Sequence, residues 1–103
     1  MPWIFLLFAG LLEIVWAVAM KQSAGFTRLW PTAVMGVSML GSFGLLALAM
    51  RDLPLGTAYT IWTGIGAVGA FSVGILFLGE ALTPARIAAA VLIVTGLVVM
   101  KLA

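Results

Sequence analysis

Residues 3–20 read WIFLLFAGLLEIVWAVAM, a stretch in which Glu13 is the only charged residue. An apolar stretch of about 20 residues is long enough to cross the roughly 30 Å hydrocarbon core of a bilayer as an α-helix. The stretch has neither the positively charged start nor the small-residue cleavage site of a secretory signal. It therefore predicts a retained membrane-spanning helix with one carboxyl group near its middle.

Three further apolar stretches, about residues 30–50, 57–78 and 85–103, follow after short polar breaks. The last of them is the weakest prediction, because only fourteen uncharged residues lie between Arg86 and Lys101. Both of these long basic side chains can extend to the membrane interface, which lengthens the usable span. Four spans take up most of the chain, so we predict an all-α membrane protein whose single domain has four transmembrane helices.

The composition agrees with lipid as the solvent. Of the 103 residues, 65% are hydrophobic and 8% are charged, whereas a typical soluble domain has about 45–50% and about 25%. A folded chain of this length has too little interior to hide so much apolar surface from water. These proportions exclude a soluble globular domain.

The residue types that are missing exclude several kinds of chemistry. The chain has no Cys and no His, which removes disulfides, thiol nucleophiles and the usual zinc and haem ligands. We therefore expect no metal and no cofactor. Without a carboxylate pair in one chain, no constellation for acid–base catalysis is visible, so we do not expect an enzyme. The basic residues are scattered singly, which is not the pattern of a nucleic-acid partner.

The basic residues give little preference for one orientation in the membrane. Lys21, Arg28 and Arg86 fall on one side of the predicted bundle, and Arg51 and Lys101 fall on the other. This is almost no bias under the positive-inside rule. Two interpretations stay open: the chain inserts with its first and third loops in the cytoplasm, or copies insert both ways and pair antiparallel.

Glu13 is the only ionisable side chain deep inside any predicted span. Such a residue is costly in a bilayer and is by default a functional-site candidate. No Lys or Arg lies at that depth, so its partner is a proton or a cationic solute. An apolar environment penalises the charged form of a carboxyl group, and exchange of a proton for a cation at such a group is the core of an antiporter. The alternative is a protonated structural carboxyl group hydrogen-bonded between helices.

Four residues on the first three spans are candidates to surround Glu13. Trp16 lies one helical turn further on and offers an indole N–H to a carboxylate and a π face to a cation. Ser42 lies in the middle of the second span, where its hydroxyl can donate to a carboxylate. Tyr59 and Trp62 share one face of the third span. The structural alternatives are a lipid-facing Trp16 and an aromatic packing stripe at Tyr59 and Trp62.

The third span is rich in glycine. Gly66, Ala70 and Gly74 form a ridge of small residues that suits close contact with another helix. Gly64 and Gly66 also mark a point where the helix could bend. Alternating access would use such a bend.

Four helices around a single carboxyl group cannot enclose a solute at the middle of the membrane. Transporters commonly build such a site between two repeats of inverted topology, and this chain has no internal repeat. We therefore expect the second half of the site to come from another copy of the chain. Ala89 and Gly96 share a face of the fourth span, which has no site chemistry and is better interpreted as an oligomer contact.

Three segments carry a resemblance to a known family. They are GLLEIVW at residues 10–16, KQSAGFTRLWP at 21–31 and PLGTAYTIWTGIG at 54–66. With its length and its four predicted spans, the chain resembles the small multidrug resistance family from end to end. Three residues after Glu13 the chain has Trp16, and at this position it resembles the guanidinium-exporter subtype. The multidrug subtype typically has Gly there.

The resemblance implies an antiparallel homodimer of dual topology in the bacterial inner membrane, surrounded by membrane lipid. The dimer would exchange protons for guanidinium and small guanidinyl cations by alternating access. Glu13 of both subunits would bind protons and substrate in turn. Trp16 and Ser42 would be its hydrogen-bonding neighbours, and Tyr59 and Trp62 would line the pocket.

The resemblance also extends to the third and fourth spans. Gly64 and Gly66 match the family's bend, and the fourth span matches its dimer contact, where Ala89 replaces the Gly of some members. Two alternatives remain. One is a low-specificity exporter of multiple drugs and quaternary ammonium cations, against which Trp16 argues. The other is a non-transporting membrane protein that partners a different complex, against which Glu13 argues.

Overall fold

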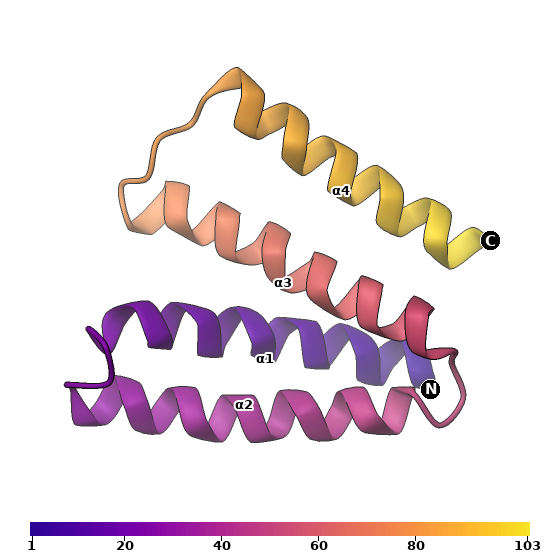
Figure 1. Cartoon of the computed structure of the whole chain (residues 1–103), viewed down its shortest axis with the longest axis horizontal. Helices are drawn as coiled ribbons and strands as arrows, with labels where there is room; N and C mark the ends of the chain where they lie inside the picture. Colours follow the sequence, from indigo (N-terminus) through magenta and orange to yellow (C-terminus); the bar gives the residue numbers. More distant parts are fainter.

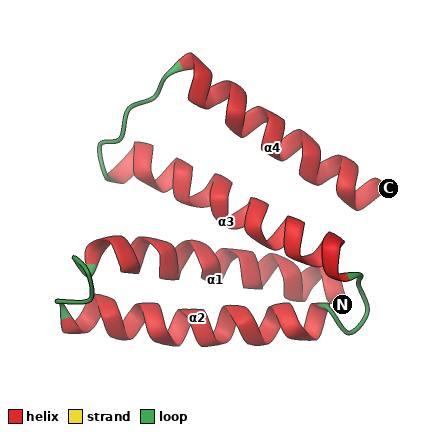
Figure 2. Ribbon diagram, viewed as in Figure 1, coloured by secondary structure: helices red, strands yellow, loops and turns green.

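The computed structural model describes residues 1–103 and is entirely helical (Figure 2). Its elements are α1 (Pro2–Gln22), α2 (Leu29–Ala49), α3 (Leu55–Phe77) and α4 (Pro84–Leu102). All four helices are long and apolar enough to cross a membrane, with mean hydropathies of 2.2, 1.8, 1.7 and 2.0 over an 18-residue window. The predicted all-α protein with four helices able to span a membrane is confirmed. Each helix lies on one of the four predicted stretches.

Local signals end α3 and begin α4. Gly79 adopts the left-handed conformation, with φ 70°, and the Glu80 amide donates to the Gly74 carbonyl at 3.0 Å. This pattern closes the last turn of a helix and favours glycine, which has no Cβ to clash. At the start of α4 the Thr83 hydroxyl accepts a hydrogen bond from the Arg86 amide at 3.2 Å, as an N-terminal cap does. The connection between α3 and α4 therefore has a specific hydrogen-bond pattern at each of its ends.

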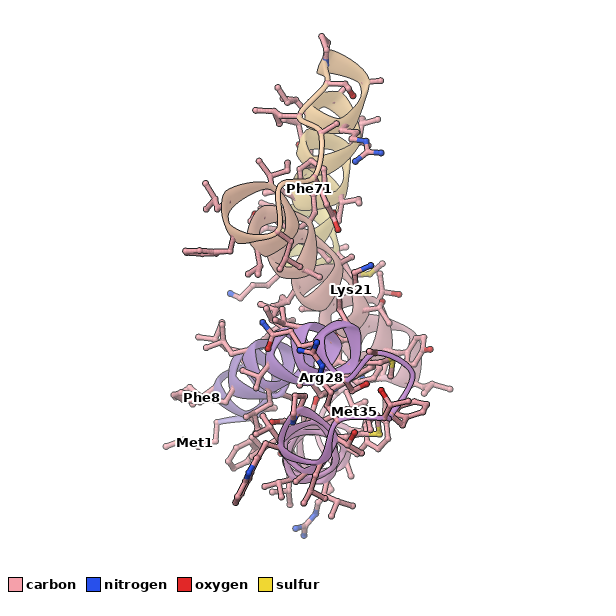
Figure 3. The ribbon with its side chains drawn as sticks, turned by 90° about the vertical axis from the view of Figure 1, so that its left-hand side faces the viewer. Met1, Phe8, Lys21, Arg28, Met35 and Phe71 are labelled. Carbon is pink, nitrogen blue, oxygen red and sulfur yellow. The ribbon has the colours of Figure 1, made fainter.

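The helices lie side by side in one row, in the order α2, α1, α3, α4 (Figure 1). Viewed from the end where α1 finishes, they stand one above another with α4 at the top (Figure 3). The Cα atoms extend over 40 × 34 × 16 Å, so the molecule is flat. Only 15 of the 103 residues are buried, and the larger cavities are grooves open to the surroundings. One chain thus encloses no central chamber.

The buried core lies toward one end of the helix axes, where the loop between α2 and α3 is found. It draws on the first half of α1, the last turn of α2 and the first half of α3. Its members are Leu6, Ala9, Leu46, Ala49, Ala58, Ile61 and Trp62. The alanines among them let the helix backbones approach closely, which is how helices associate in lipid. The first three helices are therefore packed together at this end, whereas α4 has no buried residue and packs mainly along α3.

Glycines on α3 mark its closest approaches to the neighbouring helices. A Cβ atom at Gly64 would overlap the side chain of Leu97 on α4, and one at Gly69 would overlap Ile14 on α1. The helix itself is continuous from Leu55 to Phe77. The predicted bend at Gly64 therefore stays a prediction, and what the structure shows at these glycines is close packing.

Candidate functional site

Glu13 lies in the middle of α1, on the side that faces α3. Its carboxyl group packs against Gly66, so closely that a Cβ atom at position 66 would overlap it. The Glu13 side chain is half-buried, and its Oε1 atom is buried without a hydrogen-bond partner. A buried polar atom without a partner costs free energy. A proton, or a cation that carries N–H groups, would supply what this oxygen lacks.

Ser42 ties the first three helices together beside Glu13. Its hydroxyl, which is completely buried, donates to the Ala9 carbonyl of α1 at 2.6 Å and accepts from the Trp62 indole N–H of α3 at 2.9 Å. Ala9 lies one helical turn before Glu13. The single hydroxyl proton of Ser42 is committed to Ala9, so in this structure Ser42 does not bond to Glu13. The predicted bond between them stays a prediction, and the contact that is seen anchors the helices around the carboxyl group.

Four aromatic rings, which we call the aromatic row, follow one another from α3 across α2 to α1. Trp62 lies 5.6 Å from Tyr59 and 5.7 Å from Phe43, measured between ring centroids. Phe43 in turn meets the ring of Trp16 edge-on at 6.3 Å. Tilted and edge-to-face arrangements of this kind are the favoured ones for aromatic pairs. The aromatic row therefore joins Trp16, Phe43, Trp62 and Tyr59 into one continuous cluster.

Trp16 places a second unpartnered polar atom in the site. Its indole nitrogen is buried and makes no hydrogen bond, although buried donors are normally paired. Trp16 is also one turn from Glu13 on the same helix. The site thus combines an acceptor and a donor that both lack partners within the chain. The predicted hydrogen bond between Trp16 and Glu13 is not formed here and stays a prediction.

Phe43 is the member of the aromatic row that the sequence did not indicate. A phenylalanine in an apolar helix has the same appearance whether it faces lipid, a neighbouring helix or a ligand. The one available signal was its position directly after Ser42 at the middle of the second span. Phe43 as a whole residue is 46% exposed, and this exposure leaves it accessible to a solute beside the aromatic row.

Some of the candidate residues contact one another in the structure and others do not. Ser42, Trp62 and Tyr59 are joined directly, and Trp16 is joined to them through Phe43. Glu13 contacts Gly66 but none of these side chains through a hydrogen bond.

The remaining candidate, Gly64, packs against α4 instead. Nowhere in residues 1–103 do three His, Cys, Asp or Glu side chains come together as metal ligands. The chemistry that the candidate residues offer is that of binding a flat organic cation, because they include a carboxyl acceptor and aromatic faces.

The chain is similar to known proteins over almost its whole length. The family model described as Small Multidrug Resistance protein matches residues 1–101. A protein named guanidinium exporter from Citrobacter freundii is 55% identical over 102 residues, which cover 99% of this chain and 97% of the relative. The guanidinium exporter of Salmonella typhimurium is 55% identical and that of Escherichia coli K12 is 54% identical, with the same coverage.

Proposed function

The chain belongs to the small multidrug resistance family and is a multi-pass protein of the bacterial inner membrane, and on this premise we propose that it exports guanidinium and small guanidinyl cations in exchange for protons. It acts as a transporter rather than as an enzyme. The observation that carries the proposal is the unpartnered Oε1 atom of Glu13, held against Gly66 in the middle of a membrane-spanning helix.

The chemistry of guanidinium fits the residues around Glu13. Guanidinium is planar, delocalised and weakly hydrated, and its paired N–H groups match the two oxygens of a carboxylate. Its face stacks on aromatic rings, which the aromatic row supplies. The relatives named guanidinium exporter support the same substrate class.

The proposed coupling to protons rests on the small number of charged residues within the membrane-spanning helices. Glu13 is the only acidic residue within the spans, and no basic residue lies at its depth. A single carboxyl group that binds a cation must first release its proton, and a proton that returns must displace the cation. Binding the two ligands in turn at one group is the basis of exchange.

A second copy of the chain is part of the proposal. One chain is flat and has no buried residue on α4, so a pair of chains is needed to surround the solute. The nearly even distribution of basic residues allows the two copies to insert in opposite orientations. In such a pair the packed ends of the two copies would face opposite sides of the membrane. Alternating access would result if the two copies exchanged conformations, so that one side of the membrane opens as the other side closes.

A low-specificity exporter of quaternary ammonium cations is the second candidate. The exposed ring of Phe43 favours it, because an apolar substituent could rest there. A quaternary ammonium ion has no N–H group to satisfy the Glu13 oxygen, however, and the bulk of Trp16 occupies space that a wide cation would need. The proposal therefore expects guanidinium to be the better substrate.

Transport currents from proteoliposomes on a solid-supported membrane test the proposal. We expect a current on addition of guanidinium, a weaker one with tetraethylammonium, and none with either cation in Glu13→Gln. Glu80→Gln, which removes the carboxylate of a residue that follows the end of α3, is the matched control and should behave as the wild type. Coupled guanidinium current in Glu13→Gln would exclude the proposed role of this residue, and a larger response to tetraethylammonium would favour the second candidate.

A further inference from the structure

An apolar groove of about 420 Å³ runs between α1, α3 and α4, away from the residues of the proposed transport site. Side chains such as Leu7, Ile65 and Leu97 line it, and Lys101 is the only charged residue on its wall. Trp3 stands at the same end of the groove as Lys101. We call this feature the Lys101 groove.

The ammonium group of Lys101 is held over an aromatic ring. Its Nζ atom lies 5.1 Å from the centroid of the Trp3 ring, within the range of a cation–π contact. Lys101 is in the last turn of α4, and the first turn of α1, where Trp3 lies, carries no acidic residue. The groove therefore ends in one positive charge without a neighbouring negative one on either helix.

The Lys101 groove lies on a different flank of α4 from the predicted oligomer contact. Leu97 packs against Gly64 and forms the seam between α3 and α4. Gly96 lines the cleft on one side of this seam, and Val98 and Lys101 line the groove on the other. A second copy seated on the face of Gly96 would leave the groove facing lipid.

We propose that the Lys101 groove binds an anionic phospholipid of the surrounding bilayer. The groove is long and apolar, as an acyl chain requires, and it ends at the membrane interface, where Trp and Lys side chains typically anchor a span. The positive charge at that end is complementary to a lipid phosphate. The acyl chain lies against Leu7 and Leu97, and the phosphate pairs with the Lys101 ammonium group.

Native mass spectrometry of the full chain, released from membranes with an equal mixture of phosphatidylglycerol and phosphatidylcholine, tests this inference. We expect the wild type to retain phosphatidylglycerol over phosphatidylcholine by about fivefold, the factor for one basic residue at an anionic surface. Lys101→Gln should lose the preference and Lys101→Arg should keep it. Val98→Trp, which fills the groove, should reduce the retention of both lipids.

Arg51→Gln is the matched control for loss of charge. Arg51 lies in the loop between α2 and α3, at the same end of the row as Lys101, but it is outside the groove (Figure 1). This variant should keep the wild-type preference. Equal loss of preference in Arg51→Gln and Lys101→Gln would show a general surface attraction and would overturn the proposal. A wild type with no preference for phosphatidylglycerol would overturn it as well. None of these measurements depends on transport, so the lipid site and the export function can fail separately.

Discussion

The indole N–H of Trp62 donates a hydrogen bond to the hydroxyl of Ser42 over 2.9 Å, in the buried part of the row of helices. Because the same hydroxyl donates to Ala9 of α1, one serine connects all three helices that surround Glu13. The carboxyl group is thus placed by residues that do not touch it. Loss of this connection should affect stability first and transport as a consequence.

Ser42→Ala should lower the free energy of unfolding by about 1–3 kcal/mol, because it leaves the buried indole N–H of Trp62 without a partner. Unfolding in increasing sodium dodecyl sulfate, followed by circular dichroism, measures the loss. Ser38→Ala is the control: Ser38 is buried one turn earlier on the same helix and should cost much less. Equal losses in the two variants would show that the Ser42 bond contributes nothing specific.

Gly66→Ala should weaken guanidinium binding while the chain stays folded. The added Cβ atom overlaps the Glu13 carboxyl group, which is the flexible end of a side chain and can move aside without displacing a helix. Losing a hydrogen bond to a charged group costs about 1.5–3 kcal/mol, so we expect a decrease in affinity of about tenfold to a hundredfold by titration calorimetry. Gly44→Ala, on α2 with open space around it, should leave the affinity unchanged. Wild-type affinity in Gly66→Ala would refute the proposed position of the carboxyl group.

The four spans could be predicted from the sequence because hydropathy alone decides which segments enter a bilayer. The order of the helices in the row could not. Each helix has so few polar residues that no polar face marks which side meets a neighbour. The close approaches at Gly64 and Gly66 depend on which side chain of another helix arrives there, and this is a property of packing rather than of spacing.

The sequence indicated the polar candidates for the site and gave no sign of an apolar one. Glu13 and Ser42 stand out because a charge or a hydroxyl inside a span needs an explanation, whereas Phe43 does not. The partner of Ser42 could not be predicted either, because its hydroxyl can reach a backbone carbonyl as well as a carboxylate. Three-dimensional placement chose Ala9.

Phe43→Ala should decrease guanidinium transport because it removes the ring that joins Trp16 to Trp62. One aromatic contact of this kind contributes about 0.5–1.5 kcal/mol, so losing such a contact with the substrate should lower the apparent affinity by about twofold to thirteenfold. The space that is gained should at the same time increase the current with tetraethylammonium relative to guanidinium. Phe43→Tyr keeps a ring and should retain the wild-type ratio of the two currents. An unchanged ratio in Phe43→Ala would show that Phe43 does not face the substrate.

Guanidinium affinity should increase with pH and then become constant. In the pH range where the Glu13 carboxyl group carries a proton, binding of the cation releases that proton, so the Kd should fall by about tenfold for each unit of pH increase. Where the group is already ionised, pH should have no further effect. If two copies of Glu13 share one site, their titrations are coupled and extend over a wider pH range than that of a single carboxyl group.

Titration calorimetry between about pH 6 and 9, in buffers of different ionisation enthalpy, counts the released protons. Glu80→Gln should keep this dependence because its carboxylate packs against Gly74 in the last turn of α3, about two helical turns beyond Gly66. Binding without proton release across the whole range would contradict exchange at Glu13.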